Sequence, residues 1–593
     1  MEKTVLGVWQ LNETAELEKL VIEKDGSIAA PEGKYVVMTV DGVSVTPSEG
    51  IYRGRIVLSV KDEVAHTFVR LDEKFPCRFQ TAVYIKNGKY MENASIRAAV
   101  QKGEINGEKA EGVHIKSKRP DYSGFIIEGG RYEINGIKAE LEGYGEDSEG
   151  NGAAILVLGD AKVAINNADI RAKGPMRAAL CAFDNADVEL NDCFLSVDGP
   201  DLAPADLELM KKLDRHWMPP WQIGLRGTAR TTSIDDSVTV RYNNCRLVAR
   251  NWGVLSVDDA SPRSRMFARN SVFEVTGDNG YGCFSINCDA PDNYQLSEKF
   301  GSFNTFYNCR FFVPTYLMYL SVAKSGAEFT DKTIVYSKRY GVYIFRNSGG
   351  LLKINGGTEF YTGQAAIVVK GSSSKIEVDN AKFNSADGAI LQLMDCDDPG
   401  HLFNEFRIPA GEIDEKDPAR DLTAADPLED VFMTVSNTEI SGNFFNATTN
   451  LLFKRQPNPE DCPEVPPNFK KVRGIRGNDL QGAKNLDLKL TNVKLTGIIS
   501  SALGRYKEGL TVINESNCEE MSNITCTPAE PVNNGIILTM DGKSVWNVTE
   551  TSYITKLVLE EGAVINGAKL YVDGAETKLV PGTYTGTIKL KVK

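Results

Sequence analysis

The sequence predicts an all-β fold in which short parallel strands stack as a solenoid. A short motif recurs along the middle of the chain: alternating apolar residues, then Asn, two further residues and another apolar residue. Its spacing is regular, with 25 residues from Asn167 to Asp192 and 26 from Asn244 to Asn270. Each interval holds two or three short β-rich runs and turn residues, without helical periodicity. Such a unit fits one coil of a parallel β-helix, in which equivalent residues lie about 4.8 Å apart.

The Asn position of this motif has a physical explanation. An inward Asn at a tight turn can satisfy turn backbone groups, adopt left-handed geometry and bond the Asn of the next coil. The residues at this position are Asn167, Asp192, Asn244, Asn270, Asn308, Asp331, Gly357, Asn380, Asn437 and Asn492.

Asparagine ladders of this kind resemble those of the right-handed parallel β-helix superfamily, which includes pectate lyases and polygalacturonases. The resemblance covers roughly residues 80–540, and the chain also looks similar to uncharacterised bacterial right-handed β-helix proteins. It implies a fold and does not by itself imply an activity, because such folds host unrelated functions.

The two ends of the chain contain a second repeat. Residues 8–23 (VWQLNETAELEKLVIE) align with 545–560 (VWNVTETSYITKLVLE), and residues 40–58 align with 572–590. We therefore expect an N-terminal β unit at 1–62, a β-helix at 63–540 and a homologous C-terminal β unit at 541–593. Units at both ends would cover open sheet edges. Alternatively, they form an oligomerisation module that gives a homo-oligomer.

The amino-acid composition limits the classes of partner that this chain is expected to bind. The net charge of −13 argues against nucleic acid and anionic membrane surfaces, which need a clustered basic face. No run approaches the ~20 apolar residues that span a bilayer. The first residues lack a signal-peptide pattern, which favours a cytoplasmic location. The 11 cysteines are an odd, scattered set without a CxxC pair, so we expect reduced buried thiols and no zinc site.

Four intervals between motifs are longer than one coil. They place insertions near 199–221, 288–303, 396–430 and 454–484, and the interval 192–244 is long enough for two coils. In solenoids, insertions on one face commonly mark the binding face. We expect them to wall a groove.

The strand that precedes these insertions predicts the floor of the groove. Its apolar alternation is expected to face inward: Ile223 and Leu225, Leu255 and Val257, Phe284 and Ile286, Met318 and Leu320, Tyr343 and Phe345. The other alternation then faces out, in a first row of Gly224, Ser256, Ser285, Tyr319 and Ile344 and a second row of Arg226, Asp258, Asn287, Ser321 and Arg346. Asp258 would stand one coil from Arg226, which would hold its carboxylate ionised. Asp259 would sit where the strand ends.

Several residues beside this row are candidates for chemistry. His216 lies on the first wall and is a candidate general acid or base, and Lys324 is a candidate base or anion clamp. Arg346 suits a carboxylate, and Tyr319 can supply a phenolic proton. The remaining substrate-binding candidates are Asn287, Ser321, Lys370, Trp217 and Trp221, the last two as a platform for a sugar ring. The cluster of Asp395, Asp397 and Asp398 cannot alone supply the six to eight oxygens of a calcium site, so no metal is predicted.

The superfamily resemblance adds little to these roles. Polygalacturonases combine an Asp-Asp pair with Asn-Thr-Asp and Gly-His-Gly segments on neighbouring coils. Asp258-Asp259 resembles the pair, but the coil that follows reads Gly280-Tyr281-Gly282, without the histidine. Only the two carboxylates are therefore carried over.

These features favour a cofactor-independent enzyme acting on a carbohydrate or similar small polyhydroxylated compound. The chemistry would be glycoside hydrolysis by Asp258 and Asp259, or carbon–oxygen bond elimination with His216, Lys324 or Arg226 as the base. One alternative is a cofactor-free isomerase or lyase of another small polar or phenolic metabolite. The other is a non-enzymatic, adhesin-like or glycan-binding β-helix rod.

Overall fold

The computed structural model describes residues 1–62, 64–70, 73–146, 150–199, 223–257, 263–286, 302–321, 325–345, 350–370, 374–394, 397, 430–449, 485–510, 513, 515–532 and 535–593. Within these ranges the chain is all-β with long parallel sheets, compatible with a β-helix-like solenoid. The exceptions are short 3-10 turns: η1 (Glu92–Ala94), η2 (Arg97–Ala99), η6 (Lys507–Gly509) and η7 (Glu515–Glu520). The chain forms two compact units, residues 1–217 with 227–304 and residues 218–226 with 305–593.

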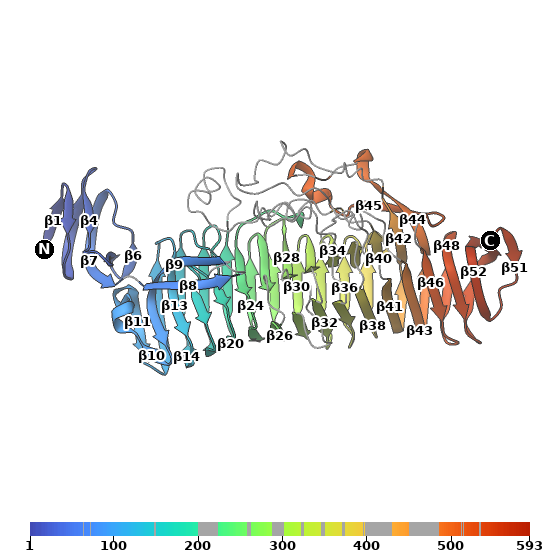
Figure 1. Ribbon diagram of the computed structural model, residues 1–593, viewed down its shortest axis with the longest axis horizontal. Helices are drawn as coiled ribbons and strands as arrows, with labels where there is room; N and C mark the ends of the chain where they lie inside the picture. The colour runs from blue at the N-terminus through green and yellow to red at the C-terminus, as the bar shows by residue number, and fades with distance from the viewer. Residues whose placement is uncertain are drawn as a thin grey trace, which may run out of the picture. The chain divides into compact units, whose positions relative to one another are not determined.

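After its N-terminal strands, which pair mostly antiparallel, the first unit continues in three ladders of parallel strands (Figure 1). The first ladder contains β14 (Arg131–Asn135), β17 (Lys162–Asn166), β20 (Asp187–Asn191), β23 (Thr239–Asn243) and β26 (Arg265–Arg269). The second contains β12 (Lys109–Ser117), β15 (Lys138–Glu142), β18 (Asp169–Lys173), β21 (Phe194–Asp198), β24 (Arg246–Ala249) and β27 (Val272–Val275). The third contains β9 (Glu73–Lys86), β13 (Tyr122–Glu128), β16 (Ile155–Leu158), β19 (Leu180–Ala182), β22 (Arg230–Ile234), β25 (Trp252–Val257) and β28 (Gly280–Ile286).

The second unit repeats this arrangement. One ladder contains β30 (Arg310–Val313), β33 (Ile334–Ser337), β36 (Glu359–Thr362) and β39 (Lys382–Ser385). Another contains β32 (Gly326–Thr330), β35 (Gly350–Ile354), β38 (Ser374–Asp379), β41 (Val431–Ser441) and β43 (Leu486–Gly497). A third contains β31 (Tyr316–Ser321), β34 (Tyr340–Phe345), β37 (Ile367–Lys370), β40 (Ala389–Met394), β42 (Asn443–Thr448) and β44 (Ile499–Tyr506), and β45 (Ile524–Pro528) pairs antiparallel with β44.

The strand registers confirm the repeat length and correct one interval. Lys162 lies opposite Asp187, which is 25 residues later in the sequence. Asp187 in turn lies opposite Thr239, so the long interval 192–244 is one repeat with an insertion and not two coils. Length alone could not distinguish these cases, because only the next strand's partner shows where the ladder resumes.

The recurring Asn position is a left-handed turn, as expected, but its side chain faces out. Asn167, Asn244 and Asn437 have φ values of 53°, 54° and 48°. All three are exposed, which contradicts the predicted inward ladder. The predicted hydrogen bond between Asn side chains of successive repeats does form, but at the surface: Nδ2 of Asn492 donates to Oδ1 of Asn437 at 2.9 Å.

At most of these turns the next residue occupies the interior instead. This position holds small side chains, among them Cys193, Cys245, Ser271 and Cys309, and all four are buried. The amide of Cys245 donates to Oγ of Ser271 at 3.0 Å, so a small hydroxyl satisfies the turn backbone. An Asn inside would bring more polar atoms than this site can pair.

The two ends of the chain pair their strands in the same register. At the N-terminus β3 (Ala15–Ile22) pairs antiparallel with β7 (Gly50–Asp62), with a shift between Leu17 and Lys19. At the C-terminus β48 (Ser552–Leu559) pairs antiparallel with β52 (Gly582–Val592), with a shift at the equivalent place, between Ile554 and Lys556. The aligned sequences therefore adopt the same local pairing.

The strands that pair with β3 and β48 differ in the polarity of their side chains. β1 (Glu2–Val5) pairs parallel with β3, and β46 (Ile536–Met540) pairs parallel with β48 in the equivalent register. β46 also pairs with β43, whereas β1 pairs only with β3 among the described residues. At equivalent positions, Leu538 is fully buried and Lys3 is exposed, with its ammonium 5.0 Å from the centroid of the Trp9 ring. A charged residue on an edge strand disfavours pairing with another chain.

Seven cysteines have side chains that the structure describes, and all seven are free thiols. Six of these are buried and Cys526 is partly exposed, which agrees with the expectation of reduced packing cysteines. Among the described residues, no helix is long and apolar enough to cross a membrane.

Candidate functional site

Most of the predicted groove lies outside the described residues. This holds for Asp258, Asp259, His216, Lys324, Arg346, Asn287, Trp217 and Trp221. It also holds for the central parts of the four predicted insertions, at 200–221, 288–301, 398–429 and 454–484. Ser321 contributes backbone to β31, and its side chain is not described. Arg226, Tyr319 and Lys370 can be placed.

The register of β25 shows that Arg226 does not lie in the predicted outward row beside Asp258. The sequence alignment put 221–227 beside 252–259, but β25 pairs with β22, so that Ser256 lies opposite Ser233 and Val257 opposite Ile234. Residues 223–227 form no strand, and Gly224 has a φ of 73°. Arg226 is exposed, and its Nη2 lies 3.4 Å from Oε2 of Glu519. The Arg, Thr and Ser residues of β22 interrupt the apolar alternation that marks a strand in sequence.

Two further predicted strand alignments placed residues on the wrong face of the sheet. Leu255 lies opposite Cys283 and Ser256 opposite Phe284, one residue away from the predicted match of Leu255 with Phe284. Tyr319 lies opposite Tyr343. Because paired residues of a parallel ladder share a face, an outward Tyr319 with an inward Tyr343 is impossible.

Tyr319 and Lys370 do not line an open groove. Their exposed fractions are 1 % and 0 %. Residues 515–523 of the same unit cover this sheet face: Oη of Tyr340 donates to the Met521 carbonyl at 3.2 Å, and Nε2 of Gln392 donates to the Ser522 carbonyl at 3.0 Å. The sequence did not predict this cover. One signal was available, because Asn492 and the turn at Asp541 are 49 residues apart, well beyond one repeat.

A fully buried ion pair fastens the cover to the sheet. Nζ of Lys370 lies 3.0 Å from Oδ1 of Asp397, and neither side chain is exposed to solvent. Oη of Tyr506 donates to Oδ2 of Asp397 at 2.8 Å, and the amide of Ser522 donates to the same oxygen. The ammonium also lies 4.8 Å from the centroid of the Tyr343 ring. Pairing of this completeness is what a buried charge requires.

This arrangement revises the roles predicted for Lys370 and the acidic cluster. Lys370 binds a carboxylate of its own chain and presents no surface to a substrate. Asp397 receives a lysine ammonium and hydrogen-bond donors, while Asp395 and Asp398 lie outside the described residues. Within the described ranges, no group of three acidic, His or Cys side chains is arranged to hold a metal ion.

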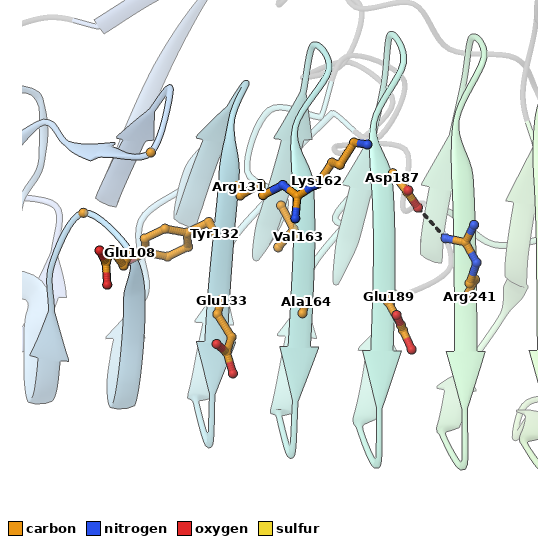
Figure 2. A pocket seen from close by; sticks show the side chains of 12 residues that line it. Glu108, Arg131, Tyr132, Glu133, Lys162, Val163, Ala164, Asp187, Glu189 and Arg241 are labelled. Atoms are coloured by element: carbon orange, nitrogen blue, oxygen red, sulfur yellow. Dashed lines mark hydrogen bonds and ion pairs between the residues drawn. The ribbon is translucent and has the colours of Figure 1, made fainter.

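An open depression in the first unit offers a different candidate site. It has a volume of about 610 Å³ and is formed by the outward side chains of β14, β17, β20 and β23 and by the turns near residues 88 and 108 (Figure 2). Its lining residues are Gly88, Gly107, Glu108, Arg131, Tyr132, Glu133, Lys162, Val163, Ala164, Asp187, Glu189 and Arg241. We call it the Ala164 groove.

The floor of the Ala164 groove follows from the ladder register. Ala164 lies between Glu133 of β14 and Glu189 of β20, so the smallest side chain stands between two long ones. A methyl group in this row leaves the hollow that the neighbouring side chains surround. Figure 2 shows both glutamates beside Ala164, in the row next to Arg131 and Lys162.

A ladder of amides runs along the next outward row of the same strands. Nδ2 of Asn166 donates to Oδ1 of Asn135, Asn191 donates to Asn166 and Asn243 donates to Asn191, each at 2.9 Å. Nδ2 of Asn135 also donates to Glu133 at 3.0 Å. These bonds fix the amides, and the bond from Asn135 helps to orient the Glu133 side chain, which lines the groove.

The opposite row of the groove carries an unbalanced charge. Arg131 and Lys162 are directly opposite each other on β14 and β17. Both are exposed, and neither forms an ion pair with any residue in the described ranges. The nearby Asp187 is paired with Arg241. A second depression of this unit, of about 590 Å³, differs: there Lys116 pairs with Glu140 and Lys118 with Glu142.

Comparisons with known proteins identify no relative of this chain. No family model matches it, no curated protein matches it, and no solved structure matches it.

Proposed function

We propose that the protein binds a saccharide in the Ala164 groove. The observation that carries the proposal is the floor of that groove: a hollow at Ala164 between the carboxylates of Glu133 and Glu189, beside the cations Arg131 and Lys162. Sugar hydroxyls donate and accept hydrogen bonds at once, so they match a lining that supplies acceptors on Glu133 and Glu189 and donors on Arg131 and Lys162. A glycan-binding role of this kind was one of the alternatives predicted from the sequence.

The lining makes other partner classes poorer matches. Protein interfaces rely on aromatic and apolar anchors in dry pockets. The aromatic ring of this groove, Tyr132, is only 3 % exposed, and its hydroxyl donates to the Asn106 carbonyl. Nucleic acid needs a clustered basic face, which a chain of net charge −13 with carboxylates along the groove does not favour.

Filling the hollow tests the proposal. Ala164→Lys places a long side chain between Glu133 and Glu189, where ion pairs support it, so folding is expected to survive while saccharide binding falls more than tenfold. The matched control is Ser196→Lys in the second depression, also on an outward ladder position. A glycan array followed by calorimetry on the hits measures both variants. Equal binding by Ala164→Lys and the natural chain would refute the site.

We further propose that the ladders form a right-handed parallel β-helix, with the N- and C-terminal β units as caps. The 25-residue steps between paired strands and the repeated left-handed turns support the first statement. The shared register of β3–β7 and β48–β52 supports the second. An experimental structure tests the hand directly.

The hydrolase or lyase activity predicted for Asp258 and Asp259 is a separate proposal. It is supported by the adjacent carboxylates that follow β25. Asp258→Asn should abolish turnover of a responsive carbohydrate without lowering the melting temperature, and a large loss of stability would show a structural role instead. The cytoplasmic location likewise stays a prediction.

A further inference from the structure

We infer that a small monovalent anion, of the size of chloride, binds between the buried guanidinium groups of Arg119 and Arg177. This site is separate from the Ala164 groove and does not rest on the proposed saccharide function. Its basis is an excess of positive charge and of hydrogen-bond donors in a part of the interior where the described residues supply no matching anion.

The two arginines meet at the corner that follows β12. β6 (Val43–Val45) lies beside the end of this strand, where the amide of Lys118 donates to the Ser44 carbonyl at 3.0 Å. Arg119 comes next in the chain, and Nη1 of Arg177 donates to the Arg119 carbonyl at 3.4 Å. The site therefore lies at the junction between the N-terminal strands and the first repeat.

Both side chains are buried and charged. Arg177 has no exposed surface, and Arg119 is 8 % exposed. Burial lowers the pKa of Arg177 to about 10, which still leaves the group protonated at pH 7. The charge of Asp121 acts to raise this pKa, but neither arginine forms an ion pair with a residue in the described ranges. Two buried cations near one carboxylate leave one positive charge uncompensated, which is costly in a protein interior.

Backbone carbonyls orient Arg177 without neutralising it. Nη1 donates to the carbonyls of Gly143 and Tyr144, each at 3.4 Å, and Nη2 donates to the Tyr122 carbonyl. Carbonyl groups are dipoles without net charge, so these bonds fix the guanidinium in place and leave its positive charge to be balanced by another group.

The cluster also contains donors that the protein does not use. Nε of Arg177 and Nη1 of Arg119 are buried and have no hydrogen-bond partner in the part of the chain that the structure describes. The same is true of Oη of Tyr122, a fully buried side chain. Arg119 lies close to this phenol, because its charge opposes the burial that raises the pKa of Tyr122. Guanidinium nitrogens can only donate, so they require an acceptor.

A small anion meets both requirements. One monovalent ion neutralises the single excess charge and accepts hydrogen bonds from the guanidinium and phenol donors together. A water molecule could accept some of these bonds but would leave the charge uncompensated. A phosphate group would bring close to two negative charges, more than the excess. The partial exposure of Arg119 gives the ion a side from which to enter.

The experiment measures thermal unfolding of the full chain at constant ionic strength, as potassium chloride replaces potassium methanesulfonate, whose anion is larger. A ligand that binds only the folded chain raises its melting temperature, so this temperature should rise between about 1 mM and about 100 mM chloride and then level off. Crystals grown in bromide should show one anomalous peak within hydrogen-bonding distance of Nη1 of Arg119.

Two variants remove proposed donors to the ion. Tyr122→Phe removes an oxygen that has no partner among the described residues, so folding should survive while chloride binding weakens about tenfold. Arg119→Met should abolish the chloride response, and in methanesulfonate it should melt above the natural chain, because an uncompensated buried cation is gone. Arg171→Met is the matched control, since this exposed arginine pairs with Asp169 and its loss should leave the chloride response unchanged.

A normal chloride response in Tyr122→Phe or in Arg119→Met would overturn the inference, and so would a bromide ion found only elsewhere in the crystal. If no ion binds, both variants should instead melt at or above the natural temperature in chloride as well as in methanesulfonate, which would equally refute it. Saccharide binding enters none of these measurements.

Discussion

Removing one partner of the buried Lys370–Asp397 pair tests how the cover at 515–523 is held. Breaking a buried ion pair typically costs about 3–5 kcal/mol, because the remaining charge is left without compensation. The two single variants should differ here. In Lys370→Met, Asp397 keeps its donors from Tyr506 and Ser522, whereas Asp397→Leu leaves both a buried ammonium and those donors unsatisfied.

We therefore expect Lys370→Met to lower local stability by about 3 kcal/mol and Asp397→Leu by about 5 kcal/mol or more. The assay is native-state hydrogen exchange at the amides of Met521 and Ser522, because a stacked-repeat chain need not unfold in one step. Lys382→Met is the control, since Lys382 pairs with Glu359 at the surface and should change exchange by less than ~1 kcal/mol. Equal effects of the two core variants, or effects below that of the control, would refute the reasoning.

The remaining predictions concern the ends, the turns and the thiols. Lys3→Leu introduces at the edge strand β1 the residue type found at the equivalent Leu538, which is buried against a neighbouring strand. Because the edge then lacks its charge, the variant should associate in a concentration-dependent manner in ultracentrifugation, whereas the natural chain should not associate through β1. Asn244→Gly should preserve melting temperature while Asn244→Val lowers it, because φ is 54° there, and equal values would contradict the turn. Burial raises the pKa of Cys518 to about 11, so at pH 7 its thiol stays protonated and should resist alkylation until the chain unfolds.

Surface charges should produce only a weak acid sensitivity. Hydrogen bonds from Lys138 and Lys116 hold the pKa of Glu140 below its ordinary value. The stabilisation is therefore present above the pKa of the unfolded chain and is lost as pH falls through the lower folded value. The Glu140 side chain is 35 % exposed, and solvent screens such surface ion pairs. Glu140→Gln should therefore flatten the acid limb of a stability profile only slightly.

The periodic parts of this protein could be read from sequence because each repeat must solve the same local problem. Alternating apolar residues bury one face of a strand, and a left-handed turn admits few residues besides Asn, Asp and Gly. Spacing such as that between Asn167 and Asp192 therefore predicted the parallel β architecture. The aligned ends likewise predicted that β3–β7 and β48–β52 would pair alike.

Tertiary structure decided every feature that depends on which segment lies beside which. A one-residue shift reverses a strand's faces, so the alignment of Leu255 with Phe284 failed although both are apolar. Arg226 left its row because a less apolar run, 230–234, pairs with β25. Lys370 became a buried partner of Asp397 because residues 515–523 fold over its strand, and nothing near residue 370 indicates this. The Ala164 groove arises from neighbouring strands whose paired residues are 25 to 52 residues apart in sequence, and only the ladder register establishes their proximity.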